Sequence, residues 1–174
     1  MLKYFLPSDY AASIYEIKLE HLRKKGIKGI ITDLDNTLIE WDRPNATPKL
    51  IEWFKKIKDN GLLVTIISNN NRQRVESFAK PLSLPFISNA KKPMSKSFKQ
   101  AIAEMGLKPS EIVVIGDQLI TDVFGGNRLG LHTILVKPVA NSDGFWTRIN
   151  RKIERYLLEK MKKKGMVYWE DKHG

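Results

Sequence analysis

The sequence contains no cysteine, and only three of its 174 residues are histidine. The absence of cysteine excludes disulfide bonds, thiolate metal sites and cysteine nucleophiles, and it is easiest to reconcile with a reducing, cytoplasmic compartment. His21, His132 and His173 are scattered without metal-ligand spacing, so we interpret them as structural or surface residues. Metal chemistry that uses carboxylate oxygens remains open.

Long apolar runs are missing too. No uninterrupted apolar stretch approaches the roughly 18 residues that a membrane-spanning helix needs, and the apolar run within residues 1–9 is too short for a signal peptide. We therefore expect neither a membrane span nor a leader. Acidic residues are scarce relative to basic ones, 19 against 30, which gives a formal net charge of +11. Such an excess favours an anionic partner: nucleic acid, a phospholipid surface or a phosphorylated substrate.

What the sequence does contain is a regular alternation of strand and helix patterns. Short, β-branched apolar runs predict strands at 27–34, 62–67, 86–88, 112–116 and 131–136. Helical patterns lie between them, and one begins at the Thr47 cap and Pro48 and stops at Asn60 and Gly61. This order predicts a Rossmann-like, three-layer α/β/α fold with a mainly parallel sheet and a ligand site at the carboxyl edge of the strands.

We expect one domain over residues 1–174, with a core at 26–140. A leading helix is expected at 8–25, capped by Ser8 or Asp9. A basic amphipathic helix is expected at about 145–164. Its apolar positions are Trp146, Ile149, Ile153, Tyr156, Leu157 and Met161, amid Arg148, Arg151, Lys152, Arg155, Lys160, Lys162, Lys163 and Lys164. Such a helix either lies on an anionic bilayer or docks its apolar stripe on the domain with its charges facing water.

Polar residues follow the predicted strands at the edge where a ligand site is expected. They are Asp33 and Asp35 after the first, Ser68, Asn69 and Asn70 after the second, Lys91 and Lys92 before a later helix, and Asp117 and Asp122 after the fourth. When two carboxylates lie two residues apart, one can act as the nucleophile in covalent attack while the other transfers a proton. Further carboxylates without nearby histidine or cysteine suit Mg²⁺, and a hydroxyl and an ammonium can complete a phosphate cradle.

The order of these motifs resembles the haloacid dehalogenase (HAD) superfamily over approximately residues 29–136. Asp-x-Asp-x-Thr alone recurs by chance, whereas four motifs at four predicted strand ends form a specific pattern. The narrower resemblance is to subfamily IIIA and its YqeG-like branch, through Thr-Asp-Leu-Asp-Asn-Thr-Leu at 32–38, Ala-Lys-Lys-Pro at 90–93 and Gly-Asp-Gln-Leu-x-Thr-Asp-Val at 116–123. That branch is similar to mitochondrial phosphatidylglycerophosphate phosphatases.

The resemblance implies a Mg²⁺-dependent phosphatase that works through an aspartyl-phosphate. Asp33 would attack phosphorus, and Asp35 would protonate the leaving group and then activate water. Ser68, with Asn69 beside it, would bind the phosphoryl group, and Lys92 would neutralise its charge. Lys91 competes for this last role, but Lys92 directly precedes Pro93, as in the Lys-Pro form of the family. The aspartate at position 35 favours phosphate-ester hydrolysis over dehalogenation or ion pumping.

The resemblance also implies a ligand set for Mg²⁺: Asp33, the backbone carbonyl of Asp35, and Asp117, with Asp122 acting directly or through water. The basic excess of the chain and the resemblance point to an anionic phospholipid such as phosphatidylglycerophosphate as the partner. A soluble or macromolecular phosphate ester and a non-catalytic module that binds RNA are the alternatives.

Motif spacing bears on the substrate as well. One predicted helix and one strand fill the interval between the first motif and Ser68, so no cap domain fits there. An uncapped site favours a large substrate, a membrane surface or a partner that excludes water. The segment 39–46, with Trp41, Asp42 and Arg43, is the candidate for contacts beyond the phosphate, in particular through Trp41 and Arg43. It is equally interpretable as a structural flap with a packed tryptophan.

Overall fold

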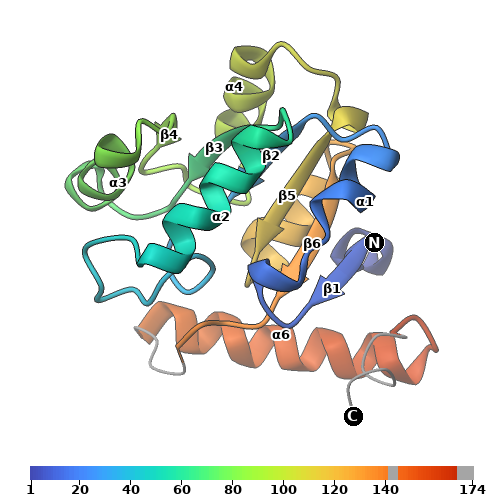
Figure 1. Ribbon diagram of the computed structural model, residues 1–174. Coiled ribbons are helices and arrows are strands. Elements are labelled where there is room, and N and C mark those ends of the chain that lie inside the picture. Colours follow the sequence, from blue (N-terminus) through green and yellow to red (C-terminus); the bar gives the residue numbers. More distant parts are fainter. Residues whose placement is uncertain (141–144, 168–174) are drawn as a thin grey trace.

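A computed structural model of the chain describes residues 1–140 and 145–167, and the side chains of 145–147 are outside this description. Its single six-stranded sheet has the order β1-β6-β5-β2-β3-β4, and every pairing is parallel (Figure 1). The strands are β1 Asp9–Ala11, β2 Gly29–Thr32, β3 Leu63–Ile67, β4 Phe86–Ile87, β5 Ile112–Gly116 and β6 His132–Val136. The α-helices are α1 Leu19–Lys24, α2 Pro48–Asp59, α3 Arg72–Ala79, α4 Ser95–Met105, α5 Gly125–Asn127 and α6 Phe145–Lys163. A π-helical segment, η5, covers Leu119–Phe124.

The three-layer arrangement follows from the central strands, whose residues alternate between two cores. Ile30 of β2 packs with the α2 residues Leu50 and Phe54 on one face, whereas the next residue, Ile31, packs with Phe98 of α4 on the other. Every residue of β2 and β5 is buried, as expected for strands covered on both faces. The predicted fold class is therefore confirmed, and no described segment forms a separate cap domain.

The predicted start of α2 is confirmed, and a glycine explains a close helix-to-sheet contact elsewhere. The Thr47 hydroxyl accepts a hydrogen bond from the backbone N–H of Leu50, at 3.2 Å, so α2 begins where the cap and proline indicated. A side chain on Gly126 would lie 2.9 Å from Thr133 and 3.0 Å from Val114. The glycine thus allows α5 to approach the sheet closely.

The expected leading helix at 8–25 is wrong. Asp9–Ala11 instead form β1, which pairs in parallel with β6, and only Leu19–Lys24 are α-helical. Between them, Ile14–Glu16 form a 3₁₀ turn that buries Ile14. The apolar spacing here suits either structure, and the open edge of β6 decides between them because it offers hydrogen bonds that a surface helix cannot use.

The helix α6 stands where the sequence indicated a C-terminal helix, and it runs along the carboxyl edge of the sheet (Figure 1). Met161 is fully buried there in a cluster with Leu119, Val123 and Leu135. Ile153 and Tyr156, predicted for the apolar stripe, are 45% and 61% exposed, so the docked face is rotated from the expected one. The Trp146 side chain lies outside the described residues. Among described helices, none combines the length and apolar character needed to cross a bilayer.

Candidate active site

The loops at the carboxyl edge of β2, β3 and β5 surround a cavity of about 360 Å³. It is lined by Asp33, Asp35, Asn36, Trp41, Ser68, Asn69, Asn70, Lys92, Gln118 and Thr121. The edge is the one that the parallel topology predicts for a ligand site. Residues that are far apart in the sequence thus meet around one space.

Three carboxylates, from Asp33, Asp117 and Asp122, lie together in this site, each with an oxygen within 4.8 Å of the others. The Thr37 hydroxyl bridges two of them, at 3.2 Å from Asp33 Oδ2 and 2.9 Å from Asp117 Oδ1. Burial, with the neighbouring carboxylates, raises the pKa of Asp117 well above its usual value. Burial likewise raises the pKa of Asp122 to about 6, although Lys92 opposes the shift. This donor set of clustered oxygens fits Mg²⁺ chemistry.

Lys92 lies between two of these carboxylates. Its Nζ is 3.0 Å from Asp33 Oδ1 and 2.6 Å from Asp122 Oδ1, and the residue is 7% exposed. Burial alone would lower the pKa of Lys92, but the Asp122 and Asp33 charges outweigh it and raise the pKa above its usual value. Lys91 is exposed and does not line the cavity. Of the two lysines considered, the structure brings Lys92 to the carboxylates.

Asp35 has two partners: Asn70, from the predicted polar run after the second strand, and Arg74, which neither the motifs nor the resemblance indicated as functional. Its Oδ2 accepts a hydrogen bond from the Asn70 amide at 2.9 Å, and its Oδ1 accepts two from Arg74, at 3.1 and 3.2 Å. Burial raises the pKa of Asp35, against the lowering effects of Asn70 and Arg74. Arg74 lies in the first turn of α3, directly after the polar run 68–71, and that position was the available signal.

Two further predicted binding residues, Ser68 and Asn69, differ in what they contact. Ser68 is buried, lines the cavity and accepts a hydrogen bond from the Asn70 N–H at 3.1 Å, so its own proton can be donated to a ligand. Asn69 also lines the cavity, but its amide is bonded to the backbone N and O of Lys92, at 2.7 and 3.2 Å. Asn69 therefore orients Lys92.

The segment 39–46 contributes one of its two predicted contacts. Trp41 lines the cavity and is 49% exposed, so it is not the packed tryptophan of a flap. Arg43 does not line this cavity, and its Nε bonds the Glu40 carboxylate at 2.9 Å, so a contact with the substrate beyond the phosphate stays a prediction. A neighbouring acid three residues away offers Arg43 a nearer partner than the phosphate site.

Arg151 of α6 is the most distant residue of the site in the chain. It donates to Asp117 Oδ2 at 2.6 Å and to the Asp117 backbone oxygen at 3.0 Å. Gly116 adds a second unpredicted requirement, because a side chain there would overlap the Asp122 carboxyl group. The motif at 116–123 included Gly116 without assigning it a role, and no local sequence signal pointed to Arg151, since both act through contacts that only the folded chain creates.

Two family models match the chain, one described as haloacid dehalogenase-like hydrolase over residues 30–91 and one as HAD-hydrolase-like over 89–142. The probable phosphatase YqeG of Bacillus subtilis (strain 168) is 59% identical over 169 residues, which cover 97% of this chain and 98% of that protein. The chain belongs to the haloacid dehalogenase-like hydrolases. With its phosphatase-named relatives, this membership makes it an HAD-type phosphatase.

More distant relatives agree with this HAD assignment. Phosphatidylglycerophosphate phosphatase 1 of Arabidopsis thaliana is 25% identical over 94% of this chain, and the match spans 50% of that protein. Among solved structures, an HAD phosphatase from Thermococcus onnurineus has a TM-score of 0.54 at 17% identity, over 68% of this chain and 90% of that one. At such identity the structural likeness shows the HAD fold alone.

Proposed function

We propose that this HAD-type phosphatase hydrolyses a phosphate monoester with Mg²⁺, through an aspartyl-phosphate on Asp33. The observation that carries the proposal is the position of the Asp33 carboxylate, which lines the cavity while contacting both Lys92 and the oxygen cluster. Asp33, Asp117 and the backbone carbonyl of Asp35 would hold the ion, with Asp122 beside them. When bound, Mg²⁺ would offset the clustered negative charge and polarise the phosphoryl group.

The chain's own residues supply the remaining chemistry. The Asp33 carboxylate attacks phosphorus, and the bond from phosphorus to the ester oxygen breaks as Asp35 gives that oxygen its proton. Asp35 then takes a proton from a water molecule that attacks the aspartyl-phosphate, which frees inorganic phosphate and regenerates Asp33. The Ser68 hydroxyl and the Lys92 ammonium hold the phosphoryl oxygens throughout. A pKa of Asp35 raised by burial suits both of its roles.

For the substrate we propose phosphatidylglycerophosphate, met at the surface of an anionic membrane by a cytoplasmic, peripherally bound enzyme. Trp41 lines the uncapped site, and two more exposed apolar residues belong to segments that adjoin its lining: Met94, two residues after Lys92, and Val139. Their side chains are 49%, 61% and 48% exposed, respectively. They follow three different strands, and the backbone N–H of Val139 bonds the carbonyl of Asn36 in the cavity wall at 2.8 Å. This apolar rim suits a substrate presented by a bilayer. The relative from Arabidopsis thaliana, named phosphatidylglycerophosphate phosphatase 1, supports the same class.

A soluble phosphate ester is the second candidate, because the lining of the cavity itself is mainly polar. The glyceraldehyde 3-phosphate phosphatase of Pyrococcus furiosus, 26% identical over 75% of this chain, favours this class. An RNA-binding, non-catalytic role remains the third hypothesis, and the same experiment tests it.

The test compares turnover of phosphatidylglycerophosphate in vesicles with turnover of a soluble panel that includes an aryl phosphate and glyceraldehyde 3-phosphate. We expect activity with Mg²⁺, none after chelation, and a loss of at least about 10³-fold in Asp33→Asn. Exposed Asp42→Asn is the matched control and should retain activity. Lys92→Gln and exposed Lys91→Gln form a second pair, in which the first should be impaired.

The outcomes separate the hypotheses. Preference for the vesicle substrate supports the lipid proposal, and preference for a soluble ester replaces it with the second candidate. Mg²⁺ binding, measured by calorimetry on the same variants, tests the oxygen cluster without using activity. No turnover of any substrate, together with RNA binding that persists in Asp33→Asn, would overturn the catalytic proposal.

A further inference from the structure

A second cavity, of about 490 Å³, lies between α6 and the carboxyl end of the sheet. Asp117 and Leu119 form part of its wall, so it adjoins the segment that carries two of the clustered carboxylates. It shares no lining residue with the active-site cavity. Its volume falls within the range of about 300–1,000 Å³ that is typical of small-molecule sites.

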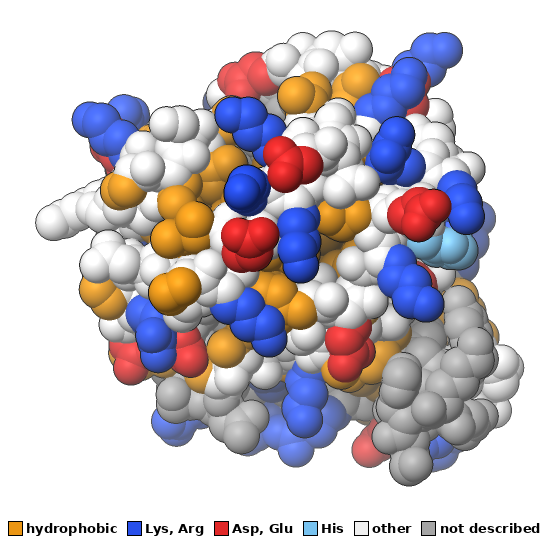
Figure 2. All heavy atoms as spheres, in the orientation of Figure 1, with side chains coloured by type: hydrophobic (Ala, Val, Ile, Leu, Met, Phe, Trp, Pro, Cys, Tyr) orange, Lys and Arg blue, Asp and Glu red, His pale blue; other side chains and the backbone are white. Residues whose placement is uncertain are grey.

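Positive charge gathers around this second cavity. Lys137, Arg148, Lys152 and Arg155 line it, and all four are exposed. None of them makes an ion pair with another described residue. Figure 2 shows Lys and Arg side chains along the α6 edge of the visible face. Asp117 and Glu154 also line the cavity, but both are buried and both pair with Arg151, so the combined field of the four exposed cations favours an anion there.

Apart from Tyr10 and the charged residues, the wall of the same cavity is aliphatic. Leu119 is fully buried, Leu135 is 8% exposed, and Leu158 of α6 packs against the same cluster. Pro138 and Ala140 also line the cavity, and the apolar residue between them, Val139, is 48% exposed at the rim of the active site. The cavity therefore combines an anion-attracting side with an apolar side that continues toward the active-site rim.

We propose that this α6 cavity binds the phosphate of an anionic phospholipid, whose adjacent hydrocarbon lies against Leu135, Pro138 and Leu158. A soluble phosphate would use the cations but leave the aliphatic wall without a partner. Single-stranded nucleic acid is bound chiefly by stacking on aromatic rings, whereas this wall is mainly aliphatic. A lipid held here would turn the apolar rim, and with it the active site, toward the bilayer.

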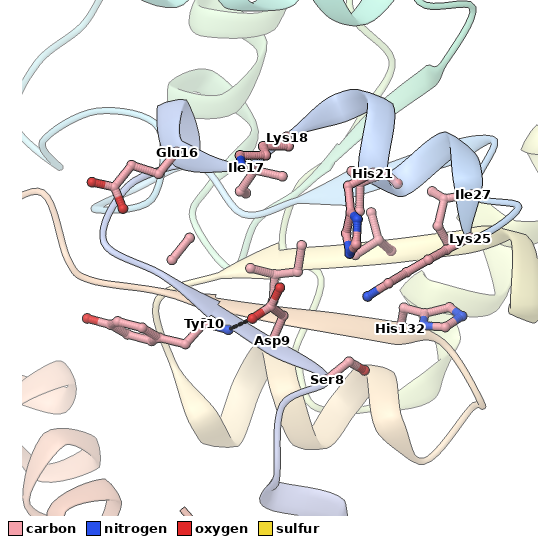
Figure 3. Close-up of a pocket in the computed structure, with 14 residues that line it drawn as sticks. Ser8, Asp9, Tyr10, Glu16, Ile17, Lys18, His21, Lys25, Ile27 and His132 are labelled. Carbon is pink, nitrogen blue, oxygen red and sulfur yellow. Dashed lines mark hydrogen bonds between the residues drawn. The ribbon is translucent and has the colours of Figure 1, made fainter. Parts of the chain in front are cut away.

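Another cavity, of about 330 Å³, provides an internal control (Figure 3). It lies among α1, β1 and β6, and His21 and Lys25 point into it. Lys18 lines it as well, but so do the carboxylates of Asp9 and Glu16. Removing Lys18 and Lys25 therefore changes the net charge of the protein as much as removing two cations of the α6 cavity does, at a different place.

The experiment measures sedimentation of the full chain with vesicles of phosphatidylcholine, with and without phosphatidylglycerol. Phosphatidylglycerol has no phosphate monoester, so the binding result stands whatever substrate the enzyme hydrolyses. We expect binding only with the anionic lipid. Each removed cation should weaken it about fivefold, equivalent to ~1 kcal/mol, so Arg148→Gln with Arg155→Gln should cost roughly 25-fold. Lys18→Gln with Lys25→Gln should cost much less.

A variant that fills the cavity distinguishes lipid binding inside it from general attraction between a basic protein surface and anionic vesicles. Ala140→Trp keeps every charge but occupies the cavity, and we expect it to weaken vesicle binding while turnover of a soluble aryl phosphate stays unchanged. Soluble glycerophosphoglycerol, which has the head group without acyl chains, should compete poorly. Equal vesicle binding by wild type and Ala140→Trp, or equal losses in the two double variants, would overturn the proposal. So would RNA or glycerophosphoglycerol that displaces the vesicles at concentrations comparable to the lipid.

Discussion

The guanidinium of Arg151 holds Asp117 through two oxygens, the carboxylate Oδ2 at 2.6 Å and the backbone carbonyl at 3.0 Å. Thr37 bonds the other carboxylate oxygen, Oδ1, at 2.9 Å. The Asp117 carboxylate is therefore oriented from both sides, and α6 becomes a structural part of the site. A helix that the sequence suggests as a surface element thus reaches the carboxylate cluster.

Arg151→Met should weaken both folding and Mg²⁺ binding. Asp117 would remain buried beside Asp33 and Asp122 without its cation, which costs on the order of 3 kcal/mol when a buried pair is broken. Chemical denaturation and calorimetric Mg²⁺ titration measure the two effects. Exposed Lys163→Met on the same helix is the control and should change neither. Unchanged Mg²⁺ affinity in Arg151→Met would contradict the orienting role.

Arg74→Met should lower kcat more for alkyl than for aryl phosphates. Arg74 orients the Asp35 carboxyl, and alkyl leaving groups depend more on the proton that Asp35 donates. We expect a loss of about 10-fold or more with an alkyl ester. Steady-state kinetics on both ester types measure the difference, with exposed Arg72→Met as the control. Equal losses for the two esters would assign Arg74 a merely structural role.

Gly116→Ala should impair the site more than the fold. The added methyl group would overlap the Asp122 carboxyl, displacing it from the cluster that Lys92 contacts. Overpacking of this kind costs about 1–3 kcal/mol. Gly126→Ala is the matched control, because it crowds Thr133 and Val114, which do not line the active-site cavity. If kcat/KM relative to wild type falls equally in both variants, the carboxylate displacement is refuted.

Glu154→Gln should stabilise the protein above neutral pH. Burial raises the pKa of Glu154 to about 7, from 4.5, although Arg151 opposes the shift. The folded state therefore binds the proton more tightly than the unfolded state, and stability falls as pH rises from 4.5 to 7. The glutamine should remove that loss, on the order of 3 kcal/mol, at pH above 7 and change little at low pH.

Denaturant titrations of Glu154→Gln on either side of this pH window measure the effect, with exposed Glu159→Gln as control. If the variant is no more stable than wild type above neutral pH, ionisation of Glu154 in the folded protein does not lower the free energy of unfolding, and the prediction is wrong.

Much of this fold could be predicted because the residues of its central strands are themselves apolar and β-branched. The buried runs of β2, β3 and β5 cannot serve as surface segments, and parallel topology brings the residues that follow them to one edge. The positions of Asp33, Ser68 and Asp117 followed from that rule. The N-terminal segment had no such signal, since pairing along β6 is a contact between Asp9–Ala11 and residues far along the chain.

The sequence by itself determined the strand and helix alternation and the polar residues at the strand ends, because these are local patterns of burial and capping. Only the tertiary structure decided which side chains complete the site. Arg74, Gly116 and Arg151 matter through the space and charge that other segments bring to them. The face of α6 that docks was also decided there. The buried pairing of Arg151 with Asp117 and the packing of Met161 set its rotation, which leaves Ile153 and Tyr156 of the predicted apolar stripe exposed.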